Sequence, residues 1–140
     1  MSKVFLDTSY ALALSFRSDV SHLKAKQIAQ LIDQDRILIV TTRAILLEIG
    51  NALSKQRFRH QGITLLTALE EEPLVKVVSM SDGLYHRAFD LFRTRSDKGW
   101  GLVDCLSCVV MQDEGIDKAL TADRHFQQMG FRALLCENYP

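Results

Sequence analysis

The chain has 140 residues, of which 47% are hydrophobic and 24% charged. These values are typical of a soluble globular protein and exclude a disordered chain, and the length predicts a single domain over residues 1–140. Lysine plus arginine balance aspartate plus glutamate at 17 each, so the net charge gives no argument for a polyanionic partner.

The amino terminus carries a short apolar run, residues 4–6, that ends at Asp7. This run is too short for a signal peptide, and no other apolar segment reaches the length of a membrane span. The chain has three cysteines, Cys105, Cys108 and Cys136. An odd number without an export signal argues against a disulfide framework. We therefore expect a cytoplasmic protein with reduced cysteines and no membrane contact.

Short apolar runs alternate along the chain with longer segments of helical spacing. This alternation predicts an α/β fold with a mostly parallel sheet of about five strands, covered by helices on both faces. The expected strands are residues 4–6, 37–40, 74–78, 119–120 and 133–135. The expected helices are roughly residues 10–16, 22–34, 43–56, 62–71, 84–94, 102–114 and 124–129. Residues suited to begin or end these helices are Ser21, Thr42, Ser81, Asp123, Gly115 and Gly130.

Four acidic residues each stand alone inside or at the end of an apolar stretch: Asp7, Glu48, Asp104 and Asp123. Asp7 and Asp123 directly follow predicted strands, and ligands of open parallel sheets bind outside the carboxyl ends of the strands. Glu48 lies on the helix after the second strand. Asp104 lies near a helix start, where the helix dipole favours a negative charge. We expect one edge of the sheet to gather all four.

Gathered carboxylates require a positive partner, because two of them about 4 Å apart repel by about 4 kcal/mol at an effective dielectric near 20. The acids have no matching cysteine and histidine pattern, so Mg²⁺ or Mn²⁺ suits them better than zinc. One or two such ions support hydrolysis of a phosphodiester.

Each acid also has a structural explanation when it is taken alone. Asp7 and Asp123 are placed to cap the helices that follow them. Glu48 is explained equally well as a partly buried residue paired with Arg43 or Lys55. The metal-site hypothesis therefore rests on the set of four acids.

Two basic clusters are placed where they can flank an acidic centre. Their possible RNA contacts are Lys55, Arg57 and Arg59 in the first cluster and Arg95 and Lys98 in the second. The alternative for either cluster is a solvated helix end.

Three other features are not assigned to the chemistry. Cys105 and Cys108 form a C-x-x-C pair inside an apolar helix, where neither a redox pair nor half a zinc site is expected. His125 is interpreted as a packing and capping residue rather than a general base. Trp100 either stacks on a base or anchors a loop.

The chain resembles the PIN domain nucleases, particularly the small stand-alone toxins of the VapC type. The resemblance covers the whole chain and rests on four segments: VFLDTS at residues 4–9, E-x-x-N-x-L at 48–53, WGLVDCLS at 100–107 and LTADRHF at 120–126. It implies a three-layer α/β/α PIN-like fold, Mg²⁺ or Mn²⁺ held by the acids, and metal-dependent cleavage of RNA.

The resemblance also assigns roles to single residues. The metal-binding and catalytic acidic quartet falls on Asp7, Glu48, Asp104 and Asp123, and its supporting polar shell falls on Thr8, Ser9, Asn51 and Thr121. Gly101 and Val103 depart from the pattern, because Ser and Thr are frequent there in relatives. A hydrogen bond in the polar shell is therefore in question, although all four acids are present.

A protein of this type is expected to be an endoribonuclease that leaves a 5′-phosphate and a 3′-hydroxyl, and to be the toxin of a type II toxin–antitoxin system. The expected partners are RNA, a cognate antitoxin protein and a second copy of the chain. The apolar residues 63–66 and Leu69 are as suited to a dimer interface as to the core.

Three alternatives to this function are considered. A non-catalytic PIN-fold module would act through a protein or RNA partner. A DNA nuclease stays open because metal-assisted hydrolysis does not need the 2′-hydroxyl. A phosphoacceptor receiver domain is disfavoured, because it needs an acidic pair after the first strand and Asp7 stands alone.

Overall fold

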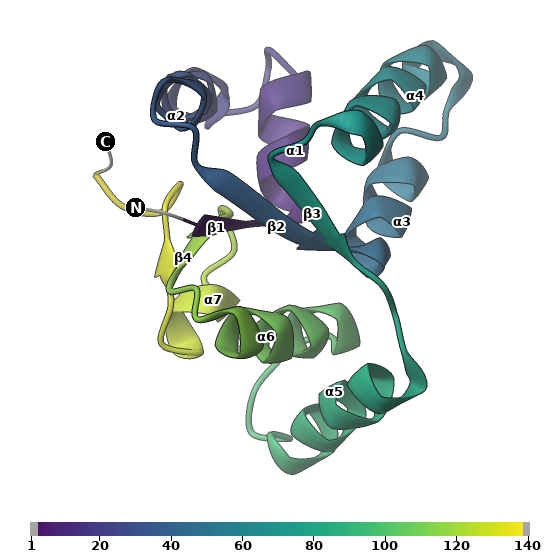
Figure 1. Ribbon diagram of the computed structural model, residues 1–140, viewed down its shortest axis with the longest axis vertical. Helices are drawn as coiled ribbons and strands as arrows, with labels where there is room; N and C mark the ends of the chain where they lie inside the picture. The colour runs from purple at the N-terminus through teal and green to yellow at the C-terminus, as the bar shows by residue number, and fades with distance from the viewer. Residues whose placement is uncertain (1–2, 139–140) are drawn as a thin grey trace.

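Within residues 3–138, which the computed structural model describes, five parallel strands form the middle layer of the molecule (Figure 1). Their order across the sheet is β3-β2-β1-β4-β5. The strands are β1 (Lys3–Leu6), β2 (Leu38–Thr42), β3 (Val75–Val78), β4 (Lys118–Leu120) and β5 (Arg132–Ala133). The predicted sheet of about five mostly parallel strands is confirmed.

Helices cover both faces of this sheet and complete the predicted three-layer α/β/α fold (Figure 1). One face carries α1 (Thr8–Ser15), α2 (His22–Gln34), α3 (Arg43–Ala52) and α4 (Gln56–Glu71). The other face carries α5 (Asp82–Thr94), α6 (Leu102–Glu114) and α7 (His125–Gln128). In the described part of the chain, no helix is long and apolar enough to cross a membrane.

Strand β1 lies at the centre of the sheet and is buried from both sides. Val4 and Phe5 are fully buried, and Phe5 packs against Phe126 of α7 with ring centroids 6.4 Å apart. A continuous apolar run is what a strand covered by helices on both faces needs. This packing fixes the position of Asp7, the residue that follows the strand.

The order of the strands places a topological switch point between β1 and β4. From β1 the chain adds β2 and then β3 on one side, and it later places β4 and β5 on the other side. The backbone N–H of Asp7 donates to the carbonyl of Leu120 at 3.2 Å, which joins the ends of β1 and β4. Open α/β sheets bind ligands in the crevice at such a point.

The predicted helix over residues 43–56 is wrong at its end. It divides into α3, which stops at Ala52, and α4, which starts at Gln56. The two helices meet where Gly62 lies against the buried Leu53, since a Cβ atom built on Gly62 would be 3.0 Å from the Cβ of Leu53. The break therefore coincides with a close approach between α4 and the residue that ends α3.

The helix predicted over residues 62–71 is wrong at its start, because α4 begins six residues earlier, at Gln56. The remaining predicted element ends agree to within two residues. The hydroxyls of Thr42 and Ser81 cap α3 and α5, as expected, whereas Ser21 precedes α2 without a side-chain cap. Gly115 ends α6 in the left-handed region at φ 68°. The expected strand 133–135 is shortened to Arg132–Ala133.

We predict that Gly62→Val lowers the free energy of unfolding by about 1–3 kcal/mol, because overpacking against Leu53 forces a backbone shift. The matched control is Gly83→Val in α5, where a Cβ atom meets nothing within 4 Å. This control should change stability by less than about 0.5 kcal/mol. Urea unfolding followed by circular dichroism measures both, and equal effects of the two substitutions would contradict the packing argument.

Candidate active site

All four isolated acids line one groove at the carboxyl ends of β1 and β4. The groove has a volume of about 440 Å³. Its lining residues are Asp7, Thr8, Ser9, Leu12, Glu48, Asn51, Asp104 and Asp123. The fold thus brings together residues that are up to 116 positions apart in the chain. Their roles as metal ligands and catalytic groups stay predictions.

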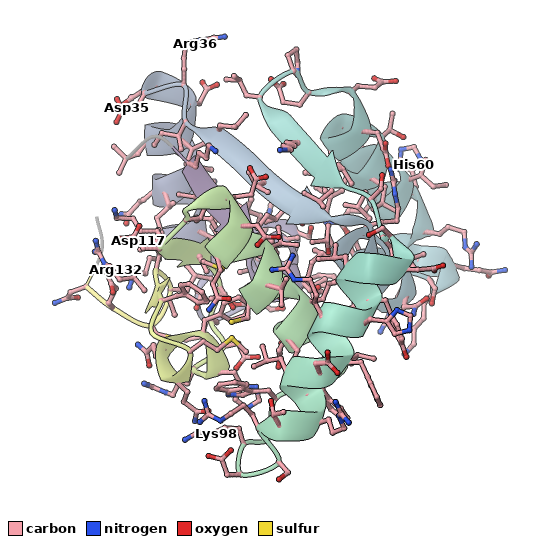
Figure 2. The ribbon with its side chains drawn as sticks, turned by 60° about the horizontal axis from the view of Figure 1, so that its bottom comes forward. Asp35, Arg36, His60, Lys98, Asp117 and Arg132 are labelled. Carbon is pink, nitrogen blue, oxygen red and sulfur yellow. The ribbon has the colours of Figure 1, made fainter. Side chains whose placement is uncertain are left out.

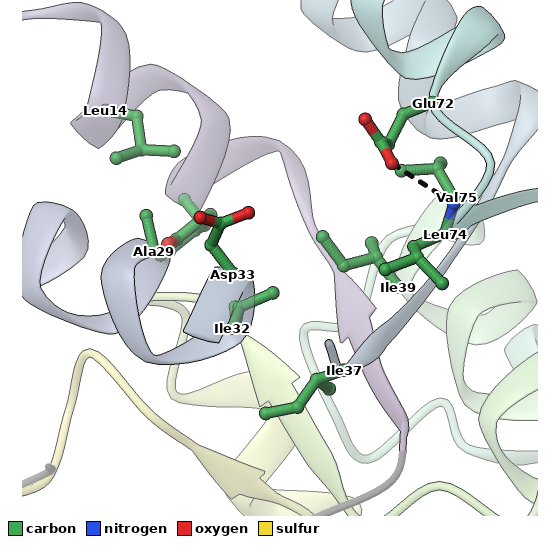
Figure 3. A pocket seen from close by; sticks show the side chains of 10 residues that line it. Leu14, Ala29, Ile32, Asp33, Ile37, Ile39, Glu72, Leu74 and Val75 are labelled. Carbon is green, nitrogen blue, oxygen red and sulfur yellow. Dashed lines mark hydrogen bonds between the residues drawn. The ribbon is translucent and has the colours of Figure 1, made fainter. Parts of the chain in front are cut away.

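A second hollow, of about 220 Å³, lies between α2 and the start of β3 (Figure 3). Its walls are mainly aliphatic, with Leu14, Ile32 and Ile39 among them. The carboxylates of Asp33 and Glu72 lie on opposite sides of it, and Glu72 accepts the backbone N–H of Leu74 at 3.4 Å. No group of convergent polar side chains is described there, so the acidic groove is the candidate site.

Asp7 is the most buried of the four acids, with only 7% of its surface exposed. Its Oδ2 accepts hydrogen bonds from the hydroxyls of Thr121 at 2.6 Å and Ser9 at 3.2 Å. Burial raises the pKa of Asp7 to about 6 and the charge of Asp104 adds to this rise, while hydrogen bonds from Thr121, Thr8 and Ser9 oppose it. A nearby cation would reverse this balance by favouring the ionised form.

The hydroxyls around Asp7 connect it to the segment that carries Asp123. Thr121 Oγ1 gives its one proton to Asp7 and accepts the backbone N–H of Asp123 at 3.0 Å. Ser9 Oγ lies 3.0 Å from Thr121 Oγ1 and accepts the backbone N–H of Ala122 at 2.9 Å. The start of α1 and the loop after β4 are therefore held to each other by side chains that also orient an acid.

Glu48 is held by a hydroxyl and not by a positive charge. Thr8 Oγ1 donates to Glu48 Oε1 at 2.6 Å. Arg43, one of the two partners that the sequence allowed, instead pairs with Glu70. The other, Lys55, begins the turn into α4 and makes no described ion pair with Glu48. Asn51 lies about one helical turn further along α3 and is exposed at the groove.

Asp104 and Asp123 each cap a helix start and face the groove at the same time. Asp104 Oδ2 accepts the backbone N–H of Gly101 at 3.1 Å and the Nδ1 of His125 at 3.0 Å. Asp123 Oδ1 accepts the backbone N–H of His125 at 2.9 Å. Capping thus uses Oδ1 of Asp123, and Oδ2 is left to serve as a ligand.

The four carboxylates share one arrangement, in which a protein donor holds one oxygen of each. The held atoms are Asp7 Oδ2, Glu48 Oε1, Asp104 Oδ2 and Asp123 Oδ1. Among the residues described, no hydrogen bond reaches the second oxygen of Glu48, Asp104 or Asp123. Hydrogen bonds of this kind orient ligating carboxylates in metal sites.

The donor set of the groove fits a hard divalent cation. In residues 3–138, no lysine or arginine pairs with these acids, and the one basic side chain in contact with them is the imidazole of His125, which is charged only when protonated. One ligand atom each from Asp104, Asp123 and His125 lies within 4.8 Å of the others. Carboxylate oxygens are the ligands that Mg²⁺ and Mn²⁺ prefer. A bound cation would compensate the negative charge of these acids and would lower the elevated pKa of Asp7.

The predicted RNA contacts lie outside the groove lining, on two separate parts of the surface. His60, beside the first cluster, and Lys98, in the second, project from different parts of the molecule (Figure 2). The guanidinium of Arg59 donates to the carbonyl of Ser54 at 2.7 Å, and Arg95 pairs with Asp97 at 3.0 Å. The remaining members, Lys55 and Arg57, are exposed at the start of α4.

Two residues near the groove were missed or left undecided by sequence reasoning. The backbone of His125 is capped as expected, but its ring also contacts Asp104. The position of His125 two residues after Asp123 was the feature of the sequence that could have indicated a place at the groove. Trp100 is buried and donates from Nε1 to Gln128 Oε1 at 2.9 Å, which anchors the loop before α6 to α7.

The C-x-x-C pair is part of the core. Cys105 and Cys108 are buried free thiols, and burial raises the pKa of both, to about 11 for Cys108. Buried thiols with a raised pKa are poor nucleophiles, so this environment argues for a structural role of the pair in the core.

Comparison with known proteins gives consistent results. The model of the family described as "PIN domain" matches residues 4–132. The 23S rRNA-specific endonuclease VapC20 of Mycobacterium tuberculosis, from strains H37Rv and CDC 1551, is 27% identical over 128 residues, which are 91% of this chain and 95% of VapC20. A crystal structure of M. tuberculosis VapC20, described as a sarcin–ricin loop cleaving toxin, aligns with a TM-score of 0.78 and 25% identity, again over 91% and 95% of the two chains.

We predict that, without divalent ions, Asp7→Asn makes the protein more stable than the wild type at neutral pH. The pKa of Asp7 is about 6 in the folded protein against an ordinary value of 3.8. The protonated Asp7 side chain therefore stabilises the folded protein fully below about pH 4. This stabilisation is lost as the pH rises through 6 and the side chain ionises. The total loss is about 3 kcal/mol, about half of it between pH 5 and pH 7.5.

Urea unfolding of both proteins in a chelating buffer at pH 5 and pH 7.5 measures this difference. The advantage of Asp7→Asn should grow with pH. An advantage that stays constant or shrinks would show that burial does not hold the pKa of Asp7 above its ordinary value.

Proposed function

This chain belongs to the PIN domain family, and from this premise we propose that it is a divalent-metal-dependent endoribonuclease and the toxin of a type II toxin–antitoxin system. The observation that carries the proposal is the groove in which one oxygen of each of four acids is held by a protein donor. Further support comes from the similarity to VapC20, which is an RNA endonuclease and a toxin.

In this proposal the chain's own residues hold and orient the reacting groups. Asp7 and Asp104, together with Glu48 and Asp123, are the ligands of Mg²⁺ or Mn²⁺. When bound, such an ion polarises phosphoryl oxygens and lowers the pKa of water. The hydroxyls of Thr121 and Ser9 orient the buried Asp7 by hydrogen bonds, and the hydroxyl of Thr8 orients Glu48 in the same way. Rigid orientation of this kind is a large part of how active sites lower barriers.

The two basic clusters supply the proposed phosphate contacts of the RNA strand. Lys55, Arg57 and Arg59 follow the helix that carries Glu48, and Arg95 and Lys98 precede the helix that carries Asp104. Because the whole chain is electrically neutral, attraction of RNA depends on these local clusters.

The partners and the location follow from the same proposal. VapC20 acts on 23S rRNA, so ribosomal RNA is the first substrate to test. A cognate antitoxin would cover the groove, and an acidic groove favours a partner that presents positive side chains. An RNA target of this kind is met in the cytoplasm. The alternative is a non-catalytic PIN-fold module that binds a protein or RNA.

We predict that Asp104→Asn lowers cleavage of RNA at least about 100-fold, because it removes one negative ligand from the groove. The control is Asp35→Asn, which changes an exposed acid at the end of α2 and should leave the rate unchanged. Mapping 5′-phosphate ends in total RNA with and without Mn²⁺ measures the rate, the metal requirement and the cut site together.

Two outcomes separate the function from its alternative. Full activity of Asp104→Asn would count against the assigned active site. Stabilisation of the wild type by Mn²⁺ without cleavage of RNA or DNA would favour the binding module.

The proposal includes a homodimer, and the exposed apolar surface points to α5 as its interface. Of the residues expected at an interface, Leu69 lies in the core, whereas Ile63 is exposed. On α5, Tyr85, Phe89 and Phe92 are each more than 40% exposed and share one side of the helix. The rings of Tyr85 and Phe89 stack with centroids 6.4 Å apart. A contiguous aromatic stripe of this kind is typical of protein interfaces.

We predict that Phe89→Glu converts the protein to a monomer, because it places a charge in the centre of the aromatic stripe. The control, Ile63→Glu, changes an exposed apolar residue on α4 and should leave the dimer intact. Light scattering coupled to size exclusion reports the mass of each. A monomeric wild type, or disruption by Ile63→Glu alone, would contradict the assignment to α5.

A further inference from the structure

We infer that His125 is a positioning residue, which sets the Asp104 carboxylate for the divalent ion by donating a hydrogen bond to one of its oxygens. The inference rests on the proposed function and adds a residue outside the acidic quartet. His125 Nδ1 lies 3.0 Å from Asp104 Oδ2. An ionised carboxylate only accepts hydrogen bonds, so the ring nitrogen that faces it carries the proton. The Nδ1–H group is thus a donor to Asp104.

His125 contacts two of the four acids at once. Its ring donates to Asp104, while its backbone N–H donates to Asp123 Oδ1 at 2.9 Å. The first acid lies in the first turn of α6 and the second follows β4, so one residue contacts two carboxylates on different elements. No other residue in the described structure donates to both the Asp104 and the Asp123 carboxylate.

The ring of His125 is held in place by its neighbours on α7 and on the loop before α6. Phe126, the next residue, is fully buried against Phe5. Trp100 bonds to Gln128 at the other end of α7, and a Cβ atom built on Gly99 would lie 3.9 Å from His125 Nε2. The position of the ring therefore follows from the packing of α7 against this loop.

The same loop supplies the second donor to Asp104. Gly101, which follows Trp100, donates its backbone N–H to Asp104 Oδ2 at 3.1 Å. Both donors thus bind the same oxygen, and both come from segments that the Trp100–Gln128 hydrogen bond ties together. The other oxygen, Oδ1, is left for a ligand. Without the imidazole, only the Gly101 N–H would restrain rotation of the carboxylate.

The structure offers a substitution that separates the hydrogen bond from the rest of the ring. The amide nitrogen of asparagine occupies nearly the position of Nδ1 and is also a donor, whereas alanine removes the donor. His125→Asn should keep the contact with Asp104, and His125→Ala should lose it. His60→Ala, on the exposed start of α4, is the matched control for loss of an imidazole.

The test is the affinity for Mn²⁺ in the absence of RNA, measured by titration with electron paramagnetic resonance detection of free Mn²⁺. We expect His125→Ala to bind Mn²⁺ about 10–100-fold more weakly than the wild type, as is usual for loss of a residue that orients a ligand. His125→Asn should bind within about threefold of the wild type, and His60→Ala should bind like the wild type. Thermal unfolding of each variant, without metal, verifies that it is folded. If His125→Ala does not fold, His125→Gln replaces it, because its amide reaches the Nε2 position instead.

Each outcome decides one claim. Wild-type affinity in folded His125→Ala would overturn the inference, as would a loss in His125→Asn as large as that in His125→Ala. A nitrogen coupling in the pulsed spectrum of bound Mn²⁺ that disappears in His125→Ala would also overturn it, since His125 would then be a direct ligand. Failure of the wild type to bind Mn²⁺ would instead overturn the metal-dependent function on which the inference rests.

Discussion

The gathering of four carboxylates in one groove, where burial and to a smaller extent the charge of Asp104 raise the pKa of Asp7, is the constraint on which the rest of the structure depends. Each acid has an oxygen held by a hydroxyl or a backbone N–H, and the imidazole of His125 is the one basic side chain described in contact with them. Hydrogen bonds from neutral groups orient a carboxylate without cancelling its charge. The groove therefore keeps a negative charge that a divalent cation can neutralise. When the cation is absent, this charge makes the folded protein less stable.

The sheet makes this arrangement possible by placing two strand ends side by side. β1 and β4 are neighbours in space although more than 110 residues separate them, and Asp7 and Thr121 follow them directly. The buried side chains of β1 leave Asp7 little freedom, and the Thr121 hydroxyl links it to the segment of Asp123. The two remaining acids arrive on helices from opposite faces, Glu48 on α3 and Asp104 on α6.

The sequence predicted the features that depend on local pattern. Buried strands appear as short apolar runs, and a charged residue that interrupts such a run is conspicuous, so the sheet and the grouping of the four acids could be anticipated. Features that depend on contacts between distant segments could not. The end of α3 coincides with the approach of Gly62 to Leu53, and the ring of His125 contacts a residue 21 positions away. The exposure of the aromatic stripe on α5 could not be predicted either, because the same spacing of apolar residues is typical of a helix packed on the core.

The most direct test of the metal site is a crystal structure of the protein with Mn²⁺, with anomalous diffraction to locate the ion. The account predicts an anomalous peak in the acidic groove within coordination distance of Asp7 and Asp104, and its loss in Asp104→Asn. The absence of any peak in the groove, or a peak bound only by surface acids elsewhere, would contradict the claim that these four carboxylates are arranged to hold a divalent cation.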